Sequence, residues 1–194
     1  MLGYFINLKN VLPFSCYNTF DDIPLSNYYR SGKKVLIIDL DNTLVPYDEE
    51  VPNDNIKNKL KELIEIGFII YIASNNHPKR VKIFCDELDK ENINIKWMAH
   101  SFKPFKRCYK WALTDVKKEI PEITPKQILS IGDQLITDCL GSNKSNIDCI
   151  LVRPIKKKTE KWYTKLNRMN ERILLKRMRN KYPSIYKEII DNHD

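Results

Sequence analysis

Residues 34–44 read KVLIIDLDNTL, an unbroken apolar run that ends in an acidic cluster. Such a run is typical of a parallel strand buried on both faces. Asp39 and Asp41 stand two residues apart, and in extended chain such residues project the same way, so two carboxylates should meet at the strand's end. The pair could bind Mg²⁺, divide into a nucleophile and a general acid/base, or merely cap a helix. The sequence predicts a buried strand with a candidate site at its carboxyl end.

Strands and helices alternate along the rest of the chain. Apolar runs predict four further strands, at 68–73, 93–98, 127–131 and 147–152. Helical patterns lie between them, beginning at Pro52, Pro78 and Pro104 and covering 136–143. This alternation predicts an α/β, Rossmann-like fold: a parallel five-stranded sheet with helices on both faces. Ligands of such sheets bind beyond the carboxyl ends of the strands.

Polar residues follow the first two predicted strands at that edge. Asn42 and Thr43 fall where a tight turn would expose backbone N–H groups able to cradle a phosphate. Ser74 and Asn75 precede a helix, where a hydroxyl and backbone donors suit either an anion or an N-cap.

Two later segments supply the opposite charge and a further acid. Lys103, just before Pro104, could offset the charge of a phosphoryl group, although a lone lysine there is more often solvated. Asp133 follows a glycine at a strand end and could complete an all-oxygen site for a hard cation, with Asp138 close behind.

Together these residues resemble the four motifs of the haloacid dehalogenase (HAD) superfamily. The matching stretches are DLDNT at 39–43, IASNN at 72–76, FKP at 102–104 and GDQLITD at 132–138. The order fits, and so do the intervals of 35, 29 and 30 residues between Asp39, Ser74, Lys103 and Asp133. The wider text, including IIDLDNTLVPYD and the basic tail, is similar to the YqeG branch of capless (subfamily IIIA) HAD phosphatases, which is related to phosphatidylglycerophosphatases.

That resemblance implies roles for the matching residues. Asp39 would be the nucleophile that forms an aspartyl-phosphate, and Asp41 would act first as general acid and then as base for water. Mg²⁺ would sit between Asp39, the Asp41 carbonyl and Asp133, with Asp138 as an alternate ligand or as support for one. The residues expected to hold the phosphoryl group are Asn42, Thr43, Ser74, Asn75 and Lys103.

The short intervals between motifs leave no room for a large cap domain. An open site suits a phosphate that protrudes from something larger. The favoured activity is Mg²⁺-dependent hydrolysis of phosphatidylglycerophosphate to phosphatidylglycerol at the cytoplasmic membrane face. The alternatives are a soluble phosphosugar, a nucleic-acid end or a phosphoprotein as substrate, or a role as an RNA- or ribosome-associated factor.

The charge is concentrated at the C-terminal end. Residues 1–152 hold 20 basic and 20 acidic side chains, whereas residues 153–194 hold 13 and 5. We therefore expect an N-terminal segment, 1–33, that packs on the core or faces a membrane, a phosphatase domain, 34–154, and a basic amphipathic helical tail, 155–194. In residues 160–180 one helical face carries Trp162, Leu166, Met169 and Ile173. That stripe could pack on the body, lie on an anionic membrane, or accompany RNA binding.

Composition excludes several other classes. The five glycines form neither a dinucleotide-binding fingerprint nor a Walker A loop. The five cysteines lack paired metal-ligand spacing and fit buried, reduced thiols of a cytoplasmic protein. No apolar run is long enough to span a bilayer, and the N-terminus lacks a basic region and cleavage site, so the expected location is the cytoplasm, with peripheral contact at the inner membrane face.

Overall fold

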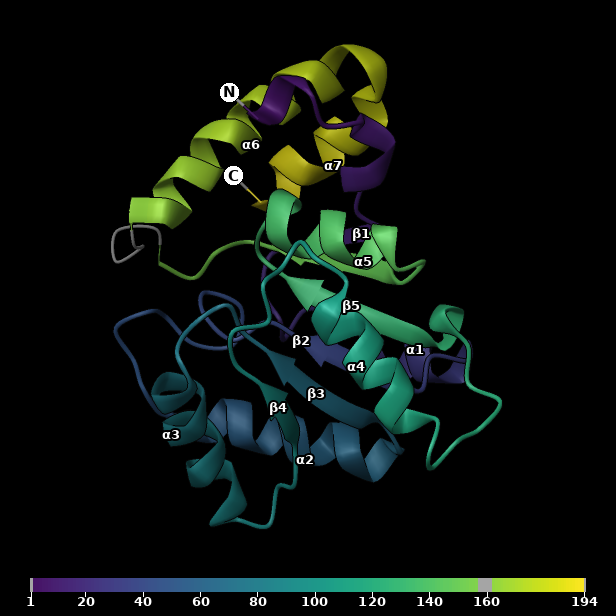
Figure 1. Ribbon diagram of the computed structural model, residues 1–194, viewed down its shortest axis with the longest axis vertical. Helices are drawn as coiled ribbons and strands as arrows, with labels where there is room; N and C mark the ends of the chain where they lie inside the picture. Colours follow the sequence, from purple (N-terminus) through teal and green to yellow (C-terminus); the bar gives the residue numbers. More distant parts are fainter. Residues whose placement is uncertain (1, 157–161, 194) are drawn as a thin grey trace.

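The computed structural model describes residues 2–156 and 162–193. Within them, six parallel strands form one sheet (Figure 1). In spatial order they are β1 (Ser15–Tyr17), β6 (Asp148–Val152), β5 (Ile128–Gly132), β2 (Val35–Ile38), β3 (Ile69–Ala73) and β4 (Lys96–Met98). The predicted α/β fold is confirmed, with six strands in place of the five expected.

The additional strand, β1, is too short to leave a pattern in the sequence. It pairs with β6 in the register Ser15↔Ile150, and Phe14 extends the pairing by donating its N–H to the Cys149 carbonyl at 2.7 Å. On its other side the Cys16 N–H donates to Glu188 Oε1 at 3.0 Å. A side chain far along the chain thus satisfies this edge, which local sequence could not indicate.

Helices cover both faces of the sheet. On each face they pack against apolar side chains of the strands. One face carries α1 (Leu25–Arg30), α2 (Asp54–Ile66) and α3 (Pro78–Asp89). The other carries α4 (Arg107–Val116) beside α5 (Leu140–Lys144), α6 (Trp162–Lys181) and α7 (Pro183–His193). Alternate residues of one strand serve the two sides: Leu36 and Ile38 face the first, Val35 and Ile37 the second.

Two expected boundaries differ from the structure. The helix expected from Pro104 begins at Arg107, because Pro104, after a cis peptide bond, lies in a turn closed by the Phe105 N–H on the Phe102 carbonyl at 2.8 Å. The helix expected over 136–143 is a π-helical turn, Leu135–Cys139, followed by α5.

The tail packs against the sheet together with the N-terminal segment. Leu174, Met178 and Ile189 are buried in one cluster with Leu8 and Val11, which belong to the segment that precedes β1. Figure 1 shows the N-terminal turns lying against the same part of the molecule as α6 and α7. No helix in the described ranges combines the length and apolar character needed to cross a bilayer.

The buried face of α6 is not the apolar stripe that the sequence suggested. Leu166 and Met169 remain 48% and 40% exposed, whereas the neighbouring Asn170 and Glu171 are buried. Asn170 Oδ1 accepts the Gly3 N–H at 3.2 Å, and a Cβ at Gly3 would come within 2.7 Å of the Asn170 carbonyl. Polar partners and this close approach therefore set the rotation of the helix.

This packing predicts which tail residues stabilise the fold. Leu174→Ala or Met178→Ala should each lower the free energy of unfolding by ~2–5 kcal/mol, because each leaves a cavity. Leu166→Ala, on the exposed side of the same helix, should change it by less than ~0.5 kcal/mol. Urea unfolding followed by circular dichroism measures all three, and equal losses would mean that α6 does not pack in this orientation.

Candidate active site

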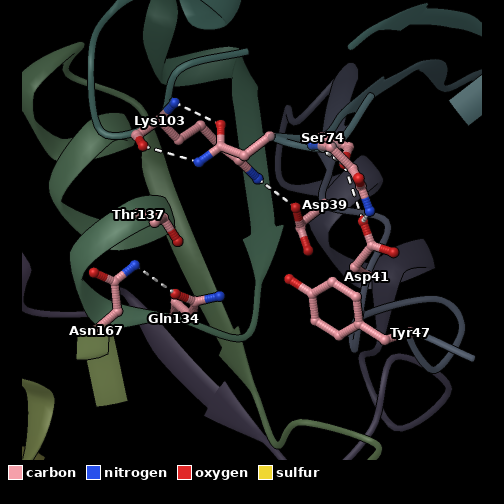
Figure 2. Close-up of a pocket in the computed structure, with 10 residues that line it drawn as sticks. Asp39, Asp41, Tyr47, Ser74, Lys103, Gln134, Thr137 and Asn167 are labelled. Carbon is pink, nitrogen blue, oxygen red and sulfur yellow. Dashed lines mark hydrogen bonds and ion pairs between the residues drawn. The ribbon is translucent and has the colours of Figure 1, made fainter. Parts of the chain in front are cut away.

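The two motif aspartates lie just beyond β2, and the chain points them into different surroundings. The Asp39 N–H donates to the Ile131 carbonyl at 2.9 Å, which keeps Asp39 in register with β5. The chain then turns, with Asn42 in the left-handed region (φ 66°). Both aspartates are buried, at 9% and 4% exposure. They lie at the carboxyl edge of the sheet, as expected (Figure 2).

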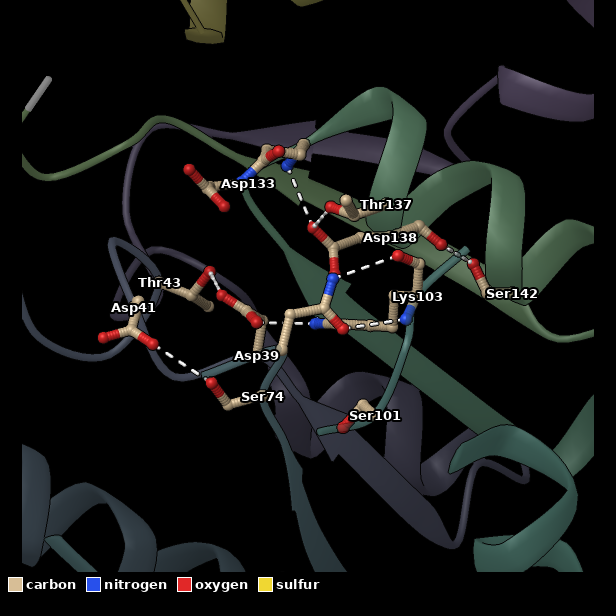
Figure 3. A network of polar contacts seen from close by, with 12 residues as sticks. Asp39, Asp41, Thr43, Ser74, Ser101, Lys103, Asp133, Thr137, Asp138 and Ser142 are labelled. Atoms are coloured by element: carbon tan, nitrogen blue, oxygen red, sulfur yellow. Dashed lines mark hydrogen bonds and ion pairs between the residues drawn. The ribbon is translucent and has the colours of Figure 1, made fainter. Parts of the chain in front are cut away.

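Asp39 is paired with Lys103, whose side chain enters the core. The Lys103 ammonium lies 2.5 Å from Asp39 Oδ1 and 2.7 Å from Asp138 Oδ1 (Figure 3). Asp39 Oδ2 accepts a weaker hydrogen bond from Thr43 Oγ1 at 3.3 Å. The side chain of Asn75 binds both the N–H and the carbonyl of Lys103, at 2.8 and 3.0 Å. Lys103 is thus a fixed interior cation, not a solvated one.

Asp41 lies in a separate set of hydrogen bonds. Its Oδ2 accepts from Ser74 Oγ at 3.1 Å and from Asn76 at 3.4 Å, and its Oδ1 accepts from Arg80 Nε at 3.2 Å. Arg80 also donates to the carbonyls of Glu50 and Pro46. Sequence reasoning missed this arginine, because its position in α3 matches none of the motifs.

The third acidic segment follows β5. Asp138, in the π-helical turn, accepts from the Gln134 N–H at 3.1 Å and from Thr137 Oγ1 at 3.0 Å. A Cβ at Gly132 would come within 2.3 Å of Asp138 Cγ. Glycine is therefore required at the end of β5 for sterics, since any larger residue would push Asp138 away from Lys103.

Asp133 is bound by the tail. Arg168 of α6 forms an ion pair with the fully buried Asp133 carboxylate and donates to its carbonyl at 2.8 Å. Arg168 also donates to Glu171 at 3.1 Å. Helix α6 thus reaches the site, although the sequence analysis assigned it to a tail outside the catalytic domain. The sequence shows that this segment is basic, but it does not show which carboxylates its arginines contact.

Burial and the crowding of carboxylates dominate the electrostatics. Burial raises the pKa of Asp39 and the Lys103 ammonium lowers it, but Asp138, Asp133 and Asp41 raise it further, so it stands well above its usual value. Burial also raises the pKa of Asp133 to about 7, against the opposing effect of Arg168. Burial alone would lower the pKa of Lys103, yet its two carboxylate partners hold it well above the usual value. Added positive charge would therefore favour the ionised carboxylates.

A pocket opens between these groups. Figure 2 shows Lys103 and Asp39 on one side, with Asp41 and the ring of Tyr47 beside them. Its lining residues are Asp39, Asp41, Tyr47, Ser74, Asn75, Asn76, Lys103, Gln134, Thr137 and Asn167. Asn167 of α6 donates to Gln134 Oε1 at 3.3 Å. It lines one side of the pocket, which the motifs did not predict.

Two predicted phosphate contacts, Asn42 and Thr43, are not among the lining residues. Asn42 Oδ1 accepts the Lys156 N–H at 3.2 Å, and the Asn42 carbonyl accepts the Ile155 N–H at 3.2 Å. Asn42 thus binds the chain that follows β6. Ser74, Asn75 and Lys103 do line the pocket, while Thr43 contacts Asp39.

The predicted metal ligands form a donor set of oxygens only. Across residues 2–156 and 162–193, no group of three or more His, Cys, Asp or Glu side chains is gathered closely enough to hold a metal ion. The predicted set needs only the carboxylates of Asp39 and Asp133 with the main-chain carbonyl of Asp41. Hard oxygen ligands of this kind suit Mg²⁺.

Comparison with known proteins gives matches over most of the chain. A family model described as mitochondrial PGP phosphatase matches residues 2–156. The Bacillus subtilis (strain 168) protein named Probable phosphatase YqeG is 32% identical over 148 residues, which cover 76% of this chain and 80% of that protein. The family match spans all four motifs and ends before α6.

Solved structures are more distant. An uncharacterized protein from Listeria monocytogenes serotype 4b is 17% identical, with a TM-score of 0.49, over 66% of this chain and 85% of that one. The HAD-hydrolase-like YfnB from Bacillus subtilis, solved bound to magnesium, is 13% identical, with a TM-score of 0.43, over 65% and 91%. Similarity this low carries no argument about substrate or metal in this chain.

The site geometry predicts that Lys103 stabilises the protein without any ligand. Lys103→Met should lower the free energy of unfolding by ~3–5 kcal/mol, because two buried carboxylates lose their shared cation. Lys82→Met is the matched control, since Lys82 pairs with Asp86 at 2.5 Å but is 61% exposed, and it should cost less than ~1 kcal/mol. Unfolding in urea with EDTA present measures both. Similar small losses would show that the interior pair is not formed.

Proposed function

This chain belongs to the mitochondrial PGP phosphatase family and is a phosphatase of the HAD type, and we propose that it hydrolyses phosphatidylglycerophosphate through an aspartyl-phosphate on Asp39. The observation that supports this mechanism is that the two aspartates of the pocket have different partners. Asp39 is paired with a fixed lysine, while Asp41 lies apart, among donors that can stabilise its carboxylate.

In the first step Asp39 attacks the phosphorus, and the bond from phosphorus to the ester oxygen breaks. Asp41, protonated, gives its proton to the leaving oxygen, and Ser74 and Arg80 stabilise the carboxylate that remains. Lys103 lies where it can neutralise the oxygens of the phosphoryl group in transit.

In the second step water attacks the phosphorus of the aspartyl-phosphate. Asp41 takes a proton from that water, the bond from Asp39 oxygen to phosphorus breaks, and inorganic phosphate leaves with Asp39 regenerated. The same carboxyl group serves as acid and then as base. It lies between its donors Ser74 and Arg80 on one side and the pocket on the other.

Mg²⁺ is the metal we propose for Asp39, Asp133 and the Asp41 carbonyl. When bound, it would supply positive charge to the phosphoryl oxygens and to the crowded carboxylates. In the structure, Lys103 and Arg168 partly neutralise Asp39, Asp133 and Asp138. Two cations among three carboxylates leave a negative balance, which fits an added cation.

A lipid-borne substrate fits the open pocket and the remaining surface charge. Among the residues that the structure describes, no separate cap domain covers the motifs, and Asn167 of α6 lines one side of the pocket. The exposed face of the same helix carries Arg172, Lys176 and Arg179, which can attract an anionic membrane. Phosphate release from phosphatidylglycerophosphate, sugar phosphates, phosphopeptides and oligonucleotide ends, compared at equal concentration, tests the choice; a preference for any but the lipid would overturn it.

Asp39→Asn should lower kcat by more than ~1,000-fold and leave folding intact, because a carboxamide is nearly isosteric but a poor nucleophile. Acid quenching after brief exposure to radiolabelled substrate should leave hydroxylamine-sensitive label on the native protein and none on the variant. Asp89→Asn, at the exposed end of α3, is the control and should behave as native. Turnover of Asp39→Asn within tenfold of native would refute the nucleophile assignment.

Removal of divalent metal with EDTA should abolish hydrolysis, and Mg²⁺ should restore it. Ca²⁺ should not, since its longer bonds and larger coordination number can engage both Asp39 oxygens and spoil the line of attack. Mg²⁺ should also raise the melting temperature of the native protein more than that of Asp133→Asn. Full activity in excess EDTA would exclude the metal assignment.

A further inference from the structure

The loop that carries Lys103 into the pocket also holds two aromatic side chains outside it. Residues 101–107 read SFKPFKR. Lys103 is 7% exposed, whereas Phe102 and Phe105, on either side of it, are 54% and 71% exposed. Figure 3 shows Lys103 reaching from this loop toward Asp39 and Asp138. One segment therefore serves the catalytic pocket on its inner side and displays two phenyl rings on its outer side.

The backbone of this aromatic loop is fixed by hydrogen bonds to the segment after β3. The His100 N–H donates to the Asn76 carbonyl at 3.1 Å, and the Ser101 N–H donates to the Ser74 carbonyl at 3.0 Å. Phe102 itself has a positive φ of 53°, a conformation that a bulky residue rarely adopts. The surrounding structure therefore holds Phe102 in this exposed position against its local preference.

The charged residues of the loop and of the first turns of α4 are of one sign. No acidic residue occurs between Asn92 and Thr114. Lys106, Arg107 and Lys110 are exposed, and the Arg107 guanidinium lies 5.4 Å from the centre of the Phe102 ring. Apolar rings with neighbouring cations are the composition that binds anionic lipid interfaces, where rings enter the acyl boundary and cations meet the phosphates.

We propose that the aromatic loop, residues 101–107, docks the protein on an anionic lipid surface. Phe102 and Phe105 enter the interface, and Lys106 and Arg107 contact lipid phosphates. A phosphate that protrudes from that surface is then separated from Asp39 by about the length of the Lys103 side chain, which reaches from the loop to Asp39. The proposal rests on the proposed function, because it takes the substrate to be lipid-borne, and it names the surface that brings the pocket to the lipid.

The first test is co-sedimentation with vesicles of phosphatidylcholine and phosphatidylglycerol. The double variant Phe102→Ser/Phe105→Ser should partition at least ~10-fold more weakly than the native protein, because two rings are lost from the interface. Phe14→Ser is the matched control: Phe14 is also 54% exposed and lies near a cation, Lys33, but it precedes β1, at the opposite edge of the parallel sheet. Its partitioning should stay within twofold, and all three proteins should hydrolyse a soluble phosphate ester at similar rates.

A second measurement reports insertion itself. All five native cysteines are buried, so an introduced surface thiol can be labelled selectively. A polarity-sensitive dye on Phe105→Cys should shift to the blue when the vesicles are added, and the same dye on Phe14→Cys should not. This arm does not depend on turnover and can be run in the Asp39→Asn background.

The outcomes separate the docking surface from the activity. Native-like partitioning of the double variant with no dye shift overturns the docking proposal, even if phosphatidylglycerophosphate is hydrolysed. Loop-dependent vesicle binding without hydrolysis of that lipid, in vesicles or in detergent, supports the surface and refutes the proposed substrate. Binding to RNA that the double variant loses, with no binding to vesicles, also overturns the docking proposal, because exposed rings among cations can stack on bases.

Discussion

The buried ammonium of Lys103, shared between Asp39 and Asp138, is the interaction on which the site depends. Removing any one of the three would leave an opposite charge buried without its partner, which is costly. Its neighbours are arranged to keep it there. The Asn75 amide holds the backbone of Lys103, and the absence of a side chain at Gly132 leaves room for Asp138.

The sequence allowed the sheet and the motif residues to be predicted because both depend on local pattern. Runs such as 35–38 are apolar throughout, and the motifs follow such runs. The features that could not be predicted depend on distant partners. β1 is completed by Glu188, and the polar residues Asn170 and Glu171 share the buried face of α6 with Leu174. No periodicity within a segment encodes a partner in another segment.

The same distinction holds inside the site. Lys103 could be identified, although isolated in sequence, because the order and spacing of all four motifs supported it. Arg80 and Arg168 could not, since an arginine in a helix usually faces solvent and nothing nearby in the sequence marks these two as partners of Asp41 and Asp133. Asn42 was predicted to present a backbone N–H to the phosphate, but that N–H donates to the Val45 carbonyl at 2.7 Å and the side chain binds the chain after β6. The motif gave the location of Asn42, and its hydrogen bonds to other segments decide what it contacts.

The pairing of Arg168 with Asp133 also bears on how the protein is made. During synthesis the four motifs emerge first, and the sheet from β2 to β6 can assemble once Val152 has left the ribosome. Asp133 then still lacks its arginine, and β1 lacks Glu188, until α6 and α7 have followed. A nascent chain therefore carries a complete set of motifs before its site is complete, and α6 and α7, which are synthesised after the motifs, supply the residues that complete it.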